Sequence, residues 1–138
     1  MFTTLLLFTG IFINSSFAQD ITIKKDVVSV NGVEICVLSD DPSVRGSFYI
    51  DDLTGSHLIY FKWIFIGDYN YYEIYDADNL EKLLCEEANT IGFKKLMLKK
   101  LYNAEVISKD GLDDKALERH GAVVGKEFTR IREEKSRN

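Results

Sequence analysis

The chain has 138 residues, enough for one domain, and carries a formal charge of −5 at pH 7. With 46% hydrophobic residues, one Pro and two Cys, its composition excludes a disordered chain, a collagen-like repeat and a disulfide-rich scaffold. The negative charge argues against a nucleic-acid partner.

Residues 1–18 have the features of a cleaved secretory signal peptide. They contain an apolar stretch without charged side chains, and Ser16 and Ala18 have the small-residue spacing that signal peptidase recognises. One usual feature, a Lys or Arg before the apolar stretch, is missing. The stretch is shorter than the roughly 20 apolar residues of a membrane anchor. We expect cleavage near Ala18, a periplasmic or extracellular location, and a mature chain of residues 19–138 without a transmembrane anchor.

Residues 19–90 are predicted to form short antiparallel strands. The segment from Ile21 to Lys24 alternates apolar and polar side chains, as a half-buried strand does. Two β-branched runs then flank Asn31-Gly32, and this dipeptide predicts a hairpin because a type I′ turn needs positive φ at both positions. Turn-forming residues separate further predicted strands at 47–50, 57–66 and 71–75. The segment 80–89 fits either a helix or a strand, and we favour a strand.

The end of the chain is predicted to be helical. Apolar residues from Phe93 to Ala104 recur at helical spacing, and Asp113 or Asp114 begins a last helix. The residues expected to face inward from that helix are Ala116, Leu117, Val123, Val124 and Phe128. Gly121 and Gly125 either permit close packing or mark a break in it.

Strands followed by helices predict a single α+β domain, an antiparallel β-meander with C-terminal α-helices packed on one face. It divides into a β-rich part, a helical part and a charged tail, at 19–90, 91–130 and 131–138.

The charge differs between these parts. Residues 19–90 hold 5 basic and 14 acidic side chains, a net charge of −9, whereas residues 91–138 hold 12 basic and 8 acidic ones, a net charge of +4. Either the basic helices lie against the acidic sheet, which is the commoner case, or they meet an anionic partner such as phospholipid headgroups.

The segments DVVSVNGVEI, FYIDDLTGSHLIYF, GFKKLMLKKLY and KDGLDDKAL follow the signal peptide in this order. In this respect the chain resembles small secreted proteins of Bacteroidetes-type bacteria that have no assigned function. The resemblance implies export and a similar fold, and it transfers no catalytic or binding residue.

The sequence contains no motif that predicts catalysis or metal binding. It lacks a nucleophile elbow, a P-loop and a dinucleotide fingerprint. His57 and His120 do not have zinc-ligand spacing, and the acidic pairs are explained as turn formers and helix caps. We therefore predict no catalytic residues, no metal and no cofactor. Cys36 and Cys85 either form one inter-strand disulfide or remain buried free thiols.

Two side-chain groups are candidates for a binding surface. The first is aromatic and crowded into one stretch of sequence: Tyr60, Trp63, Tyr69, Tyr71, Tyr72 and Tyr75. If helices cover one face of the sheet, an aromatic surface on the other face would bind a partner or ligand; otherwise these rings are core. The second is the basic face of the predicted helix, with Lys94, Lys95, Lys99 and Lys100, which is typical of a membrane-surface helix but also of any solvated helix.

These observations predict an exported binding or interaction module without catalysis, whose partner is an unidentified protein or a hydrophobic ligand. The alternative is a periplasmic carrier that holds a hydrophobic or lipid ligand between sheet and helices. A hydrolase using paired carboxylates is less favoured, because no site geometry for it is visible.

Overall fold

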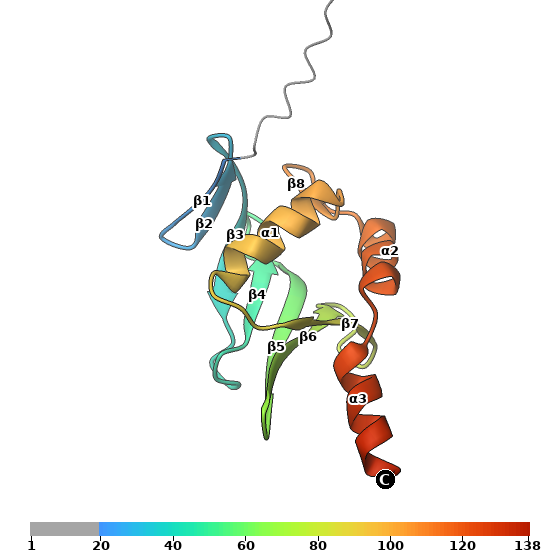
Figure 1. The fold of residues 1–138 in the computed structure, drawn as a ribbon. Coiled ribbons are helices and arrows are strands. Elements are labelled where there is room, and N and C mark those ends of the chain that lie inside the picture. The colour runs from blue at the N-terminus through green and yellow to red at the C-terminus, as the bar shows by residue number, and fades with distance from the viewer. Residues whose placement is uncertain (1–19) are drawn as a thin grey trace, which may run out of the picture.

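The computed structural model describes residues 20–138, apart from the side chain of Tyr69, so the predicted signal peptide lies outside the described residues. Seven strands form one antiparallel sheet in chain order (Figure 1). They are β1 (Ile21–Lys24), β2 (Val27–Val30), β3 (Val33–Asp40), β4 (Phe48–Asp51), β5 (His57–Ile66), β6 (Tyr69–Asp76) and β7 (Leu83–Ala88). The predicted meander is confirmed, and β7 confirms the strand favoured for 80–89.

The first two hairpins turn on residues with left-handed backbone. Asn31 and Gly32 have φ of 50° and 81°, as the predicted type I′ turn between β2 and β3 requires. Lys25 and Asp26 also have positive φ, 50° and 67°, between β1 and β2. The sequence signal for the turn between β1 and β2 is weak because neither residue is Gly, although Asp tolerates this conformation better than most side chains.

The helical part follows the sheet. It contains α1 (Phe93–Asn103), a small hairpin of β8 (Ile107–Ser108) and β9 (Gly111–Leu112), then α2 (Asp114–Val124) and α3 (Glu127–Ser136). The Asp113 carboxylate accepts a hydrogen bond from the Ala116 amide at 3.0 Å and caps α2, so the predicted helix start is confirmed.

One face of the sheet packs against α1 and α2. Phe93, the first residue of α1, stacks on Tyr72 at 4.2 Å and meets the rings of Phe48 and Phe61 edge-on. Fully buried side chains of the two helices fill the space above the sheet: Met97, Leu98, Leu101, Ala116 and Leu117. This packing confirms the predicted α+β architecture.

The predicted last helix is two helices, because the chain turns sharply at Gly125. Its φ of 77° and ψ of −166° are accessible essentially only to Gly. After this turn, Phe128 stacks on Tyr71 at 4.4 Å. Val123, predicted to face inward, is exposed because it lies on the side of α2 away from the buried Leu117. Strand alternation places Tyr71 opposite Tyr72, so α3 lies against the face of the sheet that α1 and α2 leave open. The helix continues to Ser136, through most of the segment expected to be a tail.

Buried Glu86 on β7 secures the start of α3. Its carboxylate accepts hydrogen bonds from the Thr129 amide, at 3.0 and 3.1 Å, and from the Thr129 hydroxyl. The carboxylate thereby caps the helix from a neighbouring strand, since amides in a first helical turn have no partner within the helix. These contacts explain why an acidic side chain is buried in β7.

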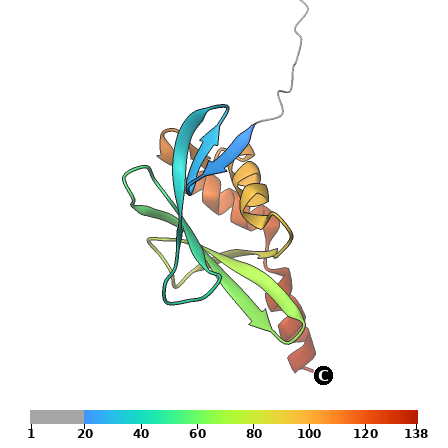
Figure 2. The ribbon, with the colours of Figure 1, turned by 90° about the vertical axis from the view of Figure 1, so that its left-hand side faces the viewer.

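Strands β5 and β6 extend beyond their neighbours. Pairing with β4 ends at Phe61, and pairing with β7 begins at Tyr71. Residues 62–70 therefore form a two-stranded ribbon that projects from the body of the molecule (Figure 2). Helix α3 runs toward the same end in both views.

Candidate binding site

The predicted aromatic surface is divided between the two faces of the sheet. Tyr72 is buried beneath α1, and Trp63 packs on the same face, where its ring contacts the backbone of Gly46. Tyr71 is buried against α3. Only Tyr60 and Tyr75 lie side by side on the open face. The side chain of Tyr69, the sixth member, lies outside the described residues.

The open face carries a row of aromatic rings in which His57, Tyr49 and Tyr60 are stacked and Tyr75 is tilted against Tyr60. Tyr49 lies 4.6 Å from Tyr60 and 3.8 Å from His57, and Tyr60 lies 6.2 Å from Tyr75. Rings that stack across neighbouring strands shield one another's faces, so the row presents mainly ring edges and hydroxyl groups to solvent. This arrangement stabilises the sheet and is a poor platform for stacking a ligand.

Acidic side chains fix the polar groups of this row. The Tyr60 hydroxyl donates to Asp41 at 2.6 Å, which lowers the pKa of Asp41, while burial raises the pKa of Tyr60. Asp51 is buried, accepts from the Ser39 hydroxyl at 2.6 Å and lies 2.5 Å from His57 Nδ1. Because the Ser39 proton goes to Asp51 and not to His57, the three residues lack the hydroxyl–imidazole bond of a nucleophilic triad.

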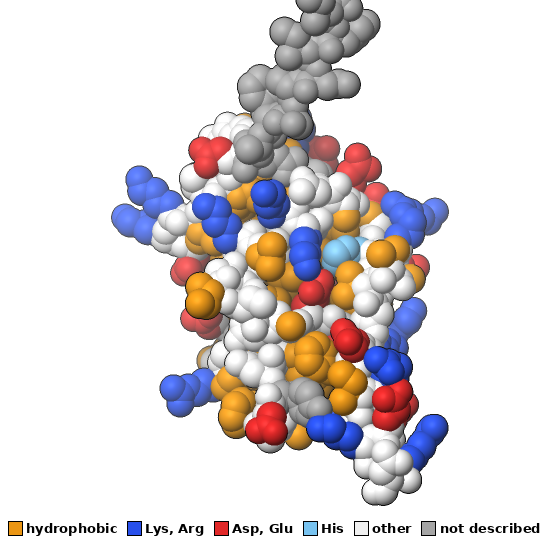
Figure 3. Space-filling model, viewed as in Figure 1, with side chains coloured by type: hydrophobic (Ala, Val, Ile, Leu, Met, Phe, Trp, Pro, Cys, Tyr) orange, Lys and Arg blue, Asp and Glu red, His pale blue; other side chains and the backbone are white. Residues whose placement is uncertain are grey.

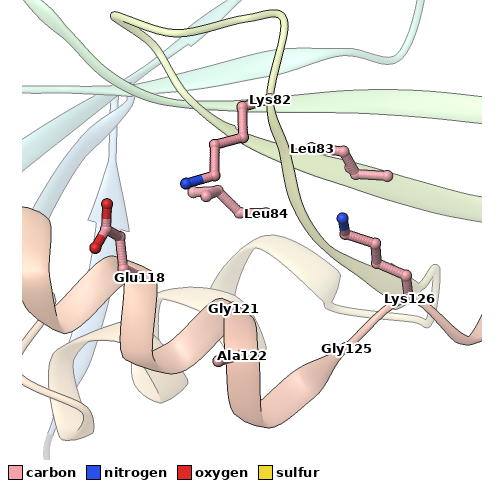
Figure 4. Close-up of a pocket in the computed structure, with 8 residues that line it drawn as sticks. All are labelled: Lys82, Leu83, Leu84, Glu118, Gly121, Ala122, Gly125 and Lys126. Atoms are coloured by element: carbon pink, nitrogen blue, oxygen red, sulfur yellow. The ribbon is translucent and has the colours of Figure 1, made fainter.

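A pocket of about 430 Å³ lies between α2 and the segment that leads into β7. Figure 4 shows its lining, in which Leu84 and the two glycines Gly121 and Gly125 form a surface with little side-chain bulk. A Cβ atom at Gly121 would lie 3.0 Å from the Leu84 carbonyl oxygen, so this glycine permits the close approach of α2 to β7. The Gly125 carbonyl also accepts from the Glu86 amide at 3.0 Å, which holds the end of α2 against the strand.

Three charged side chains surround this pocket. Lys82 comes from the turn before β7, Lys126 from the start of α3 and Glu118 from α2, and all three line the pocket. In Figure 4 the Lys82 ammonium lies on the same side of Leu84 as the Glu118 carboxylate, and the Lys126 ammonium lies on the other side. Two ammonium groups and one carboxylate leave a net positive charge beside an apolar wall of Leu83 and Leu84. Its volume lies within the range of small-molecule sites, and the pocket is open to solvent along one side.

The basic face of α1 is partly used within the fold. Lys94 lies 3.7 Å from Asp40 and over the ring of Phe48, and Lys100 lies 3.3 Å from Glu87. Lys95 and Lys99 are exposed. The contacts of Lys94 and Lys100 favour the first interpretation of the charge asymmetry, in which basic helices lie against an acidic sheet.

The two cysteines do not form a disulfide. Both are free and buried, Cys36 on β3 and Cys85 on β7, and three strands separate them in the sheet. Of the two alternatives that the sequence leaves open, the structure therefore has the buried free thiols and not the inter-strand disulfide. Burial raises the pKa of each thiol to about 12, which makes both unreactive.

Within residues 20–138, no group of three or more His, Cys, Asp or Glu side chains is placed to hold a metal ion, and this holds for His57 and His120. Over the same residues, none of the helices has the length and apolar character needed to cross a membrane. Comparison of the chain with protein-family models, with curated proteins and with solved structures found no match.

Proposed function

We propose that this protein is an exported binding module that takes a small organic anion in the pocket between α2 and β7. The observation that carries the proposal is that Lys82 and Lys126 both line a pocket of about 430 Å³ beside the apolar side chains of Leu83 and Leu84. Ammonium groups attract carboxylate or phosphate oxygens, and Leu83 and Leu84 provide contact for a short apolar body. Glu118 would accept a hydrogen bond from a donor group on the same ligand.

The packing of the interior favours this pocket over a lipid carrier. A carrier needs space between sheet and helices, but that space holds the fully buried side chains of Met97, Leu98, Leu101 and Leu117. A ligand at the pocket between α2 and β7 requires no rearrangement of that core. Export rests on the pattern of residues 1–18.

Hexanoate and its neutral analogue hexanamide test the pocket, because the two probes share an apolar chain and differ in charge. We expect hexanoate to shift the NMR amide signals of Leu84, Gly121 and Gly125 in a saturable way, and hexanamide to have little effect. The variant K82Q/K126Q should weaken hexanoate binding by at least about tenfold, equivalent to about 1.4 kcal/mol.

The matched control is K95Q/K99Q, which removes the same charge from exposed positions on α1. It should bind hexanoate like the unaltered protein. Ala122 is exposed and lines the pocket, so A122F fills the space without disturbing the core and should also abolish binding. Equal responses to the two probes, or equal losses in both lysine variants, would show that the pocket does not select anions.

Export has a separate test. The protein recovered from the cell envelope of its host should have the mass of residues 19–138 with both thiols reduced. Recovery of the chain from Met1 in the cytoplasm would contradict export and leave the pocket proposal standing.

A further inference from the structure

The tip of the β5–β6 hairpin exposes large apolar side chains. Phe65 is 67% exposed and Ile66 is 45% exposed, and the Trp63 ring lies 5.8 Å from that of Phe65. Single exposed apolar side chains are ordinary. Several on a projecting ribbon, beyond the last strand pairing at Phe61, indicate a contact with something outside the chain.

The apolar residues lie on both faces of this ribbon. Alternation along β5 directs Trp63 and Phe65 to one face and Ile64 and Ile66 to the other. A groove on a protein partner typically covers one face of an inserted element, whereas the apolar part of a lipid layer surrounds it on all sides. The two-sided pattern therefore fits a membrane surface better than a protein groove.

Charge supports the same partner. Helix α3 runs toward the hairpin end of the molecule (Figures 1 and 2), and residues 126–137 contain five Lys or Arg and three Glu. Figure 3 shows hydrophobic side chains gathered at this end, with Lys and Arg side chains and a smaller share of Asp and Glu side chains around them. Anionic lipid headgroups attract such a basic border.

We propose that this end of the molecule docks on a membrane surface that contains anionic lipid. Phe65 and Ile66 enter the interfacial layer, and the exposed basic side chains of Arg130 in α3 and Arg137 at its C-cap lie over the headgroups. Arg130 is paired with Glu134 at 2.7 Å in the free protein, so its guanidinium exchanges that exposed partner for a headgroup oxygen. Asp68 in the hairpin turn keeps the insertion shallow, because a carboxylate stays at the level of the headgroups. Shallow apolar insertion and electrostatic attraction together supply the two contributions that stable peripheral binding needs.

Vesicle sedimentation tests this inference, with phosphatidylcholine vesicles that either contain or lack phosphatidylglycerol. We expect the protein to sediment with the anionic vesicles, less so at high salt, and weakly with phosphatidylcholine alone. The F65S/I66S variant should lose at least about tenfold in affinity, and R130Q/R137Q should lose the preference for phosphatidylglycerol. Both substitutions are at exposed sites, so the fold is retained.

The control is V123S, which removes an exposed apolar side chain from α2 and should leave binding unchanged. Trp63 is the only Trp in the chain, so a blue shift of its fluorescence reports insertion of the hairpin. Failure to bind anionic vesicles, binding that F65S/I66S retains, or unchanged Trp63 fluorescence would each overturn the inference. Each outcome is independent of hexanoate binding at the pocket.

Discussion

The two faces of the sheet use aromatic side chains in opposite ways. On the face beneath α1, Phe48, Phe61 and Tyr72 surround Phe93 in an apolar cluster from which solvent is excluded. On the open face, Tyr49, Tyr60 and Tyr75 form a row, the first two stacked and the third tilted, whose polar groups reach carboxylates or solvent. The same strands supply both sets, and a shift of one residue in register would exchange them.

The comparison shows that aromatic content alone does not identify a binding surface. The helices decide which rings become core, and cross-strand stacking then occupies the ring faces that remain. The features left for contact with other molecules are the pocket beside α2 and the hairpin tip. Both lie at the margins of the sheet.

The largest expected effect concerns the reactivity of the two thiols on the helix-covered face. Cys36 and Cys85 lie on the helix-covered side, where burial raises the pKa of each thiol to about 12 from the usual 9.0. Labelling of the folded protein at pH 8 should therefore be at least about a thousandfold slower than in denaturant. Two thiols should react in denaturant without reductant. Rapid labelling of the folded chain would show that this face is not closed to solvent.

Substituting one ring on each face should measure separately how much the apolar cluster beneath α1 and the row on the open face contribute to the free energy of unfolding. Phe93→Ala removes the centre of the apolar cluster and should lower the free energy of unfolding by about 3–5 kcal/mol. Tyr49→Ala removes one member of the stacked row and should cost about 1 kcal/mol, the scale of a cross-strand pair. Urea unfolding followed by circular dichroism measures both. Equal losses would mean that the open row contributes as much as the core.

Much of this architecture is readable from the sequence because it depends on local chemistry. Asn31-Gly32 specifies its turn through backbone conformation, and Asp113 specifies a helix start through its side chain. The sequence allows two roles for Gly121 and Gly125, close packing or a break in the helix. In the structure Gly121 permits the close packing of α2 on β7, and Gly125 marks the break. The course of α3 was missed because it depends on Glu86, whose contact with Thr129 is distant in sequence.

The candidate sites are harder to predict because they too depend on contacts between residues far apart in the sequence. Lys82 and Lys126 line one pocket only after α2 packs on β7, and no sequence motif contains both of them. The aromatic stretch was visible in the sequence, but its division between faces depends on strand pairing. Likewise Asp51 falls between the predicted strands 47–50 and 57–66, and His57 begins the second of them, so nothing in the sequence predicts their contact. A β-bulge between Ile50 and Asp51 sets the register in which they meet.

A smaller effect concerns His120, which lies on α2 near Glu87 and Lys100. Burial lowers the pKa of His120 from the usual 6.5, and its Nε2 atom is buried without a hydrogen-bond partner among residues 20–138. The unfolded chain therefore takes up a proton near pH 6.5 that the folded chain accepts only at lower pH. Stability should fall as the pH drops from about 7.5 to 5.5.

Replacing His120 by Asn should make the free energy of unfolding less dependent on pH over this range. Arg119→Gln, at an exposed position on the same helix, should leave the pH dependence of the free energy of unfolding unchanged. Urea midpoints measured across this pH range make the comparison. A slope that persists in the Asn variant would assign the proton uptake to another group.

The smallest expected effect comes from removing a single hydroxyl group on the open face. Tyr60→Phe removes the hydrogen bond that contributes most to the lowered pKa of Asp41, so the pKa of Asp41 should rise toward its usual 3.8. A lowered folded-state pKa contributes stability above the unfolded pKa, and that contribution disappears as pH falls through the folded value. The variant should therefore lose less stability than the unaltered protein below about pH 4.

Tyr75→Phe is the matched control, since it removes a hydroxyl from the same row without touching Asp41. An NMR titration of the Asp41 side chain in the two variants should move the pKa only in Tyr60→Phe. If both variants change the pKa of Asp41, the hydroxyl groups of the row influence Asp41 together, and not only through the hydrogen bond from Tyr60. If neither does, the Ser43 amide, which donates to Asp41 at 2.9 Å, is sufficient to hold the carboxylate in its charged form.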